Sequence, residues 1–165
     1  MALRTAKLLL VLAVALYYTF VVFNNLTDYD SNYQFVRHVL MMDSTSAGNR
    51  GMWRALNSPA WHTTFYILLI AWEALTMLLL WWGAWRMRRA LPASAEIFQQ
   101  SKRIAVAGLT LGMLMWLGAF LTIGGEWFLM WQSQTWNGQE AAFRMFTVIG
   151  IVLLLLALPE SDVQS

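Results

Sequence analysis

The chain has 165 residues, of which 59% are hydrophobic and only 12% are charged, a composition that excludes a soluble domain with a charged surface. Its ten tryptophans favour a membrane protein, because tryptophan is enriched where lipid meets water. The absence of cysteine excludes disulfides, thiolate metal sites, iron–sulfur clusters and a cysteine nucleophile. The net charge of +2 comes without a basic face interleaved with aromatic residues, so nucleic acid is excluded as a partner.

The first apolar run predicts a membrane span at about residues 8–24, just after Arg4 and Lys7. A cleaved signal peptide is the alternative interpretation. The small residues Ala13 and Ala15 lie inside the apolar run, however, and bulky side chains follow where a cleavage site requires small ones. The pattern therefore favours an uncleaved membrane anchor.

The loop at residues 25–61 contains a short amphipathic segment at residues 32–42. On a helical wheel, its apolar and polar side chains fall on opposite arcs: Phe35, Val36, Val39, Leu40 and Met42 on one, Gln34, Arg37 and His38 on the other. We expect a short helix that lies on the outer membrane surface. The polar, glycine-containing stretch at residues 43–57 predicts a flexible surface loop.

Three further apolar runs are long enough to cross a membrane, at about residues 62–85, 104–131 and 141–158. The second follows Pro59, and the first turn of a helix tolerates the missing N–H of proline. The third exceeds the ~20 residues that a bilayer requires, so it is expected to tilt or to project from the membrane. The sequence predicts an all-α membrane protein, with four transmembrane helices in a bundle that forms one domain over residues 1–165.

The distribution of lysine and arginine predicts the orientation. Seven of the eleven basic residues lie at the N-terminus or in the 86–103 connection, namely Arg4, Lys7, Arg86, Arg88, Arg89, Lys102 and Arg103. Cytoplasmic loops carry such an excess, so both termini and the 86–103 connection are expected in the cytoplasm. The 25–61 loop and the turn before the fourth span are then expected outside.

Glu73 is the sharpest anomaly, because it falls near the middle of the second span. A carboxylate that faces lipid there would cost roughly 3 kcal/mol, so we expect the side chain to face the bundle. Thr76 and Trp116 are the hydrogen-bond donors that the sequence offers at this depth. One hypothesis is a proton or cation relay, and the plainer one is an interhelical hydrogen bond that fixes packing.

A second cluster of polar and aromatic residues is expected at the outer ends of the third and fourth spans. It comprises Glu126, Trp127, Gln132, Asn137, Gln139 and Arg144. Glu126 and Arg144 come to similar depths, which predicts a salt bridge between helices, although Glu140 competes for Arg144 at the i,i+4 spacing. Gly124 and Gly125 admit either a ligand or a closely packed helix.

The two histidines, His38 and His62, both fall on the predicted outer side. They can be interpreted as haem ligands or, with Asp43 or Glu126, as ligands of a divalent metal. Their spacing matches no metal-binding signature, so a structural role is favoured for each, and no cofactor is predicted. No nucleophile elbow and no phosphate-binding glycine loop is present, which argues against an enzyme.

Several segments together resemble a known family. They are residues 24–29, 35–43, 123–133, 136–139 and 142–144, with Ser58-Pro59, Glu73 and Gly83-Ala84. They closely resemble an uncharacterised family of bacterial predicted small integral membrane proteins. The resemblance covers nearly the whole chain and implies a four-span protein of the bacterial inner membrane whose function is unknown. It supplies no catalytic residues to transfer.

Three functional hypotheses follow from these patterns. The leading one is a non-enzymatic membrane component that binds a small ligand, a membrane or periplasmic protein, or a second copy of itself. Its binding candidates on the outer face are His38, Asp43, His62, Glu126, Trp127, Gln132, Asn137, Gln139 and Arg144. The second is a proton-coupled transporter of a small solute that uses Glu73, and the third is a redox subunit that holds haem or quinone.

Overall fold

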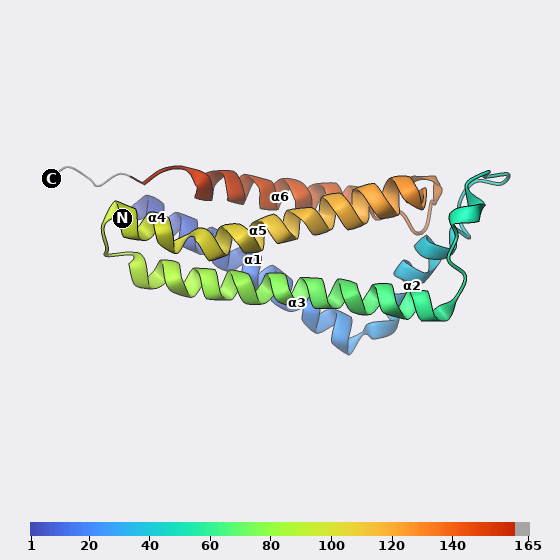
Figure 1. Ribbon diagram of the computed structural model, residues 1–165, viewed down its shortest axis with the longest axis horizontal. Helices are drawn as coiled ribbons and strands as arrows, with labels where there is room; N and C mark the ends of the chain where they lie inside the picture. Colours follow the sequence, from blue (N-terminus) through green and yellow to red (C-terminus); the bar gives the residue numbers. More distant parts are fainter. Residues whose placement is uncertain (161–165) are drawn as a thin grey trace.

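The structure of the protein, a computed structural model, describes residues 1–160. Within these residues the chain forms helices and connections, with no strand. In chain order the elements are α1 (Ala2–Thr27), α2 (Tyr29–Met41), the 3-10 helix η1 (Met52–Arg54), α3 (Pro59–Ala90), α4 (Ala95–Ser101), α5 (Arg103–Leu114), the π-helix η2 (Met115–Trp127), the 3-10 helix η3 (Met130–Gln132) and α6 (Gln139–Ala157). Figure 1 shows that α1, α3, α5 and α6 extend side by side along the molecule.

Four segments of the described chain are long and apolar enough to cross a membrane: α1, α3, the continuous run Ala95–Trp127 and α6. This confirms the predicted all-α membrane bundle. Large apolar side chains lie on its outside, among them Leu9 at 59%, Leu68 at 58% and Leu154 at 70% exposure. Apolar side chains of this kind suit contact with lipid. The helical backbone suits it too, because a helix forms its backbone hydrogen bonds within the segment.

The helices differ in length from the apolar runs that predicted them. α1 and α3 extend beyond residues 8–24 and 62–85 at both ends, because helical hydrogen bonding continues into the polar flanks. The 86–103 connection is itself mostly helical, since α3 reaches Ala90 and α4 follows. The third span ends at Trp127 rather than 131, because Leu129 adopts a left-handed backbone with φ 54°.

The spans form an up-down-up-down bundle in which each contacts its sequence neighbour and α1 also contacts α6. One end of the bundle carries Met1, α4 and the end of α6 (Figure 1), and is named the terminal end. The opposite end carries α2, η1, η3 and the turn at residues 133–138, and is named the loop end.

The core of the bundle lies along α1. Val11, Ala15 and Tyr18 of this helix are fully buried. The Tyr18 hydroxyl accepts a hydrogen bond of 3.1 Å from Nε1 of Trp116. It also lies so close to Gly112 that a Cβ there would be 2.7 Å away. Gly112 is therefore where Tyr18 of α1 approaches α5.

α3 and α5 lie in close contact at Gly83. A Cβ built on Gly83 would lie 2.5 Å from the backbone nitrogen of Ala105 and 2.7 Å from its Cα. About one turn further along α5, a Cβ on Gly108 would lie 3.1 Å from the side chain of Leu80 in α3. Gly83 lets the two helices pack backbone to backbone and Gly108 leaves room for the Leu80 side chain, which is the usual use of small residues between spans.

The terminal end is closed by three basic side chains that meet one carboxylate. Nζ of Lys7 and Nζ of Lys102 both donate to Oε1 of Glu160, at 2.5 Å and 3.0 Å, and both also donate to the carbonyl of Leu158. Nε of Arg4 lies 3.7 Å from Oε2 of Glu160, and its Nη1 donates to the carbonyl of Ala93. This cluster, named the terminal clamp, ties α1, α5 and the connection before α4 to the end of α6.

Burial of Glu160 disfavours its ionised form, but the hydrogen bonds and charges of Lys7 and Lys102 outweigh this effect and lower the pKa of the carboxyl group. The Glu160 side chain is only 4% exposed. A carboxylate so enclosed by cations stabilises the folded state as long as it stays ionised.

The amphipathic segment of the first loop is a helix, as predicted, although it begins earlier than residue 32. α2 starts at Tyr29 and ends at Met41, and Met42, which follows it, has a left-handed backbone with φ 54°. Its apolar arc contacts protein rather than lipid: Val39 and Leu40 are buried in a cluster with Phe128 and Met130. Part of the apolar arc that was expected to face the membrane surface is thus packed against the bundle.

Candidate functional site

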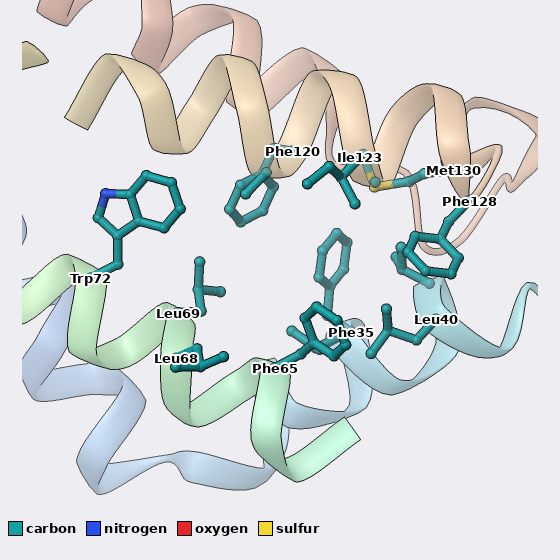
Figure 2. Close-up of a pocket in the computed structure, with 14 residues that line it drawn as sticks. Phe35, Leu40, Phe65, Leu68, Leu69, Trp72, Phe120, Ile123, Phe128 and Met130 are labelled. Atoms are coloured by element: carbon teal, nitrogen blue, oxygen red, sulfur yellow. The ribbon is translucent and has the colours of Figure 1, made fainter. Parts of the chain in front are cut away.

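A cavity of about 360 Å³ lies between α2, α3 and η2 at the loop end, and is named the lateral cavity. Fourteen residues line it: Phe35, Val36, Val39, Leu40, Phe65, Leu68, Leu69, Trp72, Ala119, Phe120, Ile123, Gly124, Phe128 and Met130. Apart from the indole N–H of Trp72, their side chains carry no hydrogen-bonding N or O atom. Figure 2 shows Leu68 and Leu69 of α3 facing Phe120 and Ile123 of η2 across the space.

The lateral cavity is closed toward the terminal end and open at its side. At the closed end, Nε1 of Trp72 donates a hydrogen bond of 3.1 Å to the carbonyl of Leu111, which joins α3 to α5. At the side, Leu68 and Ile123 line the cavity and are nevertheless 58% and 48% exposed. The opening therefore lies on the apolar outer surface between two spans, where a lipid-soluble molecule has access.

The divergence of α3 from the third span creates this space. The two helices touch at Gly83 and separate toward the loop end (Figure 1). The third span also changes to π-helical hydrogen bonding from Met115 onward, as in the 3.0 Å bond from the N–H of Phe128 to the carbonyl of Ile123. A π-helix inside an α-helix is often associated with a functional site.

Polar residues form a rim beside the lateral cavity. His38 stacks on Trp136 with ring centroids 4.6 Å apart and an angle of 6° between the planes. Its Nδ1 lies 2.7 Å from Oδ2 of Asp43. Trp136 in turn packs against Phe35, which lines the cavity. The structure thus brings two predicted site residues, His38 and Asp43, next to an apolar space that sequence reasoning missed.

Ser133 holds this rim together. Its hydroxyl oxygen accepts hydrogen bonds from Oγ of Ser44 at 2.7 Å and from the N–H of Trp136 at 2.8 Å. Oε1 of Gln132 accepts from the N–H of Ser46 at 3.2 Å. The loop that was expected to be flexible is therefore bonded to the turn at residues 133–138.

Asn137 and Gln139 make local structural contacts. Oδ1 of Asn137 accepts a hydrogen bond of 3.1 Å from the N–H of Gln139, at the start of α6. The side chain of Gln139 lies against Gly125, where a Cβ would be 2.6 Å from its Nε2. Gly125 therefore serves close packing, whereas Gly124 lines the lateral cavity. Of the two alternatives offered for this glycine pair, close packing applies to Gly125.

Trp127 belongs to an exposed cluster of one arginine and two indoles. The guanidinium carbon of Arg54 lies 5.4 Å from the ring centroid of Trp53 and 5.1 Å from that of Trp127. Nη1 of Arg54 also donates to the carbonyl of Trp127 at 3.0 Å. Sequence reasoning named Trp127 but missed Arg54, which comes from the loop 73 residues earlier.

His62 is a buried histidine of α3, with 2% exposure. Its Nε2 donates to the carbonyl of Leu56 at 2.7 Å, and its Nδ1 has no partner among residues 1–160. Within the same residues, no group of three or more histidine, aspartate or glutamate side chains is arranged to hold a metal ion.

Glu73 faces the bundle, as expected, but its hydrogen-bond donor is neither Thr76 nor Trp116. Thr76 donates back to the carbonyl of Trp72, and Trp116 donates to Tyr18. The donor is Nδ2 of Asn25, 2.6 Å from Oε2 of Glu73. In the sequence, Asn25 is a polar residue that directly follows the first apolar run. This position was the signal that could have identified Asn25 as the partner of Glu73.

Asn25 also connects Glu73 to the loop end. Its Oδ1 accepts hydrogen bonds from Nδ2 of Asn32 at 2.6 Å and from the hydroxyl of Tyr66 at 3.3 Å. Asn32 is exposed, whereas Glu73 is 3% exposed. A chain of side-chain hydrogen bonds therefore extends from the surface to the buried carboxyl group.

Neither salt bridge predicted for Arg144 forms in the part of the chain that the structure describes. Glu126, Glu140 and Arg144 are all exposed, and no ion pair joins them. The physical reason for Glu126 is the π-helix, which has more residues per turn than the assumed α-helix and so changes the direction of the side chain.

The apolar spans define a helical membrane protein, and an apolar cavity lies at the side of its bundle. The chain matches the family described as predicted small integral membrane protein (DUF2165) over residues 3–159, and it belongs to that family. The predicted family is thereby confirmed, and its function is unknown. No curated protein and no solved structure is similar enough to count as a match.

Proposed function

We propose that this protein is a non-enzymatic membrane component that binds the hydrocarbon chain of a membrane lipid in the lateral cavity. The observation that carries the proposal is the apolar lining, which places the aromatic rings of Phe35, Phe65 and Phe120 around one space. Its volume of about 360 Å³ is within the range of about 300–1,000 Å³ that is typical of small-molecule sites.

The rim supports an amphipathic ligand rather than a plain hydrocarbon. A chain that enters between Leu68 and Ile123 leaves its polar head near the loop end, where His38, Asp43 and Trp136 offer a ring face and hydrogen-bonding groups. Phospholipids and isoprenoid quinones share this combination of a long chain and a polar head. We propose a phospholipid, and the measurement below distinguishes it from a quinone and from haem.

Replacing Ala119 by leucine is expected to remove the bound lipid, because the larger side chain fills the lateral cavity. The matched control is Ala107→Leu, which adds the same atoms at an exposed position on α5. Both variants and the wild type are purified from their native membrane in mild detergent, and the extracted lipids are quantified by mass spectrometry. The wild type and the control are expected to retain one phospholipid more per protein than Ala119→Leu, because the substitution fills only the lateral cavity.

The outcomes separate the alternatives. A redox-sensitive ultraviolet band would identify a quinone, and a Soret band would identify haem. Equal lipid content in Ala119→Leu and Ala107→Leu would contradict binding in the lateral cavity.

We further propose that the loop end faces the periplasm in the inner membrane of a bacterium. The support is the excess of lysine and arginine at the terminal end, which retains it in the cytoplasm. Because the chain has no cysteine, single cysteines report the orientation directly. A membrane-impermeant thiol reagent is expected to label Gln134→Cys in intact cells and Glu96→Cys only after permeabilisation, and the reverse pattern would reject this orientation.

Proton-coupled transport through Glu73 is a second candidate function. The support for it is the hydrogen-bond chain from Asn32 through Asn25 to this carboxyl group. Amide side chains hold a carboxyl group in place but do not readily exchange protons, so this geometry favours the packing role over the relay.

Two substitutions of Glu73 separate packing from transport. Glu73→Gln keeps an oxygen that accepts from Asn25, so its stability in detergent is expected to match the wild type. Glu73→Leu leaves the buried Asn25 amide without this acceptor, and a loss of about 1–3 kcal/mol is expected. Thermal unfolding measures both. Proton uptake into vesicles that contain the wild type, absent with Glu73→Gln, would instead favour transport.

A further inference from the structure

A second hollow, of about 320 Å³, lies at the terminal end between the start of the third span and the end of α6, and is named the basic groove. Its lining residues are Gln99, Gln100, Lys102, Arg103, Val106, Leu156 and Ala157. It is separate from the lateral cavity, with which it shares no lining residue.

The basic groove has one polar and one apolar wall. Arg103 and Gln99 are exposed and have no side-chain partner among residues 1–160. Val106 and Leu156 are apolar and at least half buried by the adjoining helices. Since Arg103 stands where the polar α4 gives way to the apolar α5, the groove lies at the boundary between headgroups and hydrocarbon.

The charges around the basic groove favour an anion. In the terminal clamp next to it, Lys7 and Lys102 share one carboxylate, that of Glu160, so these three side chains together retain an excess of positive charge. Lys102 belongs to the clamp and also lines the groove. The guanidinium group of Arg103 can bind two phosphate oxygens at once, which lysine cannot do in the same geometry.

We propose that the basic groove binds the phosphate headgroup of an anionic phospholipid, with Arg103 contacting the phosphate and Val106 and Ala157 contacting the first part of an acyl chain. Basic pockets between spans are known to hold such headgroups. The apolar wall distinguishes a lipid from a free phosphate ester, which would gain nothing from it. This proposal does not depend on the ligand of the lateral cavity.

The test uses the whole protein in detergent with phosphatidylglycerol, phosphatidylcholine or glycerol phosphate added, and counts bound molecules by native mass spectrometry. Arg103→Gln is expected to weaken phosphatidylglycerol binding about tenfold, which corresponds to one charge-assisted contact. The matched control is Arg88→Gln, which removes the same charge from an exposed position at the same end of the bundle but outside the groove. It is expected to bind like the wild type.

A second variant tests the apolar wall without a change of charge. Ala157→Phe narrows the basic groove and is also expected to weaken phosphatidylglycerol binding. Equal loss in Arg103→Gln and Arg88→Gln, or binding of phosphatidylcholine as tightly as phosphatidylglycerol, would overturn the proposal. Binding of glycerol phosphate as tightly as the lipid would identify a free phosphate ester as the ligand instead, which also overturns it.

Discussion

Replacing Gly83 by valine is expected to lower the free energy of unfolding by about 3 kcal/mol or more, the upper part of the range for overpacked cores. The added Cβ would lie 2.5 Å from the backbone nitrogen of Ala105 and 2.8 Å from its Cβ. Backbone atoms of a hydrogen-bonded helix do not move aside as the end of a flexible side chain does. α3 and α5 must therefore separate, and the contacts along their whole interface weaken.

Gly118→Val is the control for this substitution. Gly118 also lies in the third span, but a Cβ built on it meets no atom within 4 Å. Its stability is expected to stay within about 1 kcal/mol of the wild type, the scale of helix propensity. Tryptophan fluorescence during thermal unfolding in detergent follows both proteins, and an equal loss in the two variants would show that close approach at Gly83 is unimportant.

Replacing Glu160 by alanine is expected to destabilise the protein by about 3–5 kcal/mol, because removal of one partner leaves buried charges uncompensated. Lys7 and Lys102 have side-chain exposures of 1% and 2%, and Glu160 is the carboxylate that both contact. Glu96→Ala is the control, since Glu96 is an exposed acid at the same end. Unchanged stability of Glu160→Ala in a denaturant titration would contradict the role of the terminal clamp.

Acid is expected to reproduce part of this loss. The pKa of Glu160 is lower in the folded state than in the unfolded chain, where the pKa of glutamate is about 4.3. The carboxylate therefore contributes its full stabilisation above about pH 5, and this contribution is lost as the pH falls through the lowered folded pKa. Stability measured from pH 7 downward is expected to fall less steeply for Glu160→Gln than for the wild type, and parallel curves would reject this linkage.

The sequence predicted the spans and the amphipathic helix well, because both depend on patterns along a single segment. Apolar runs that are long enough to cross a bilayer leave few alternatives to a helix. The apolar and polar arcs of α2 were predicted equally well from the sequence, but the partner of the apolar arc was not predicted. Leu40 packs against Phe128 instead of lipid. Periodicity identifies which face is buried but does not identify what buries it.

The contacts between segments were predicted less well, because they depend on the rotation and register of each helix. The Glu73 partner was sought at matching depth in α3 and η2, whereas α1 supplies it through Asn25. The pairing of Glu126 with Arg144 assumed α-helical geometry through a stretch that is π-helical. The lateral cavity had no signal at all, since its lining residues are the same apolar types that fill any membrane core.

The terminal clamp also sets an order of events during synthesis. Lys7 enters the membrane with the first helix, yet the carboxylate that it contacts stands 153 residues later in the chain. Until Glu160 has been synthesised, the ammonium group of Lys7 lacks this carboxylate and α1 is not locked to α6 at this end. This end of the bundle is therefore locked only once α6 has been made and brings the counter-charge with it.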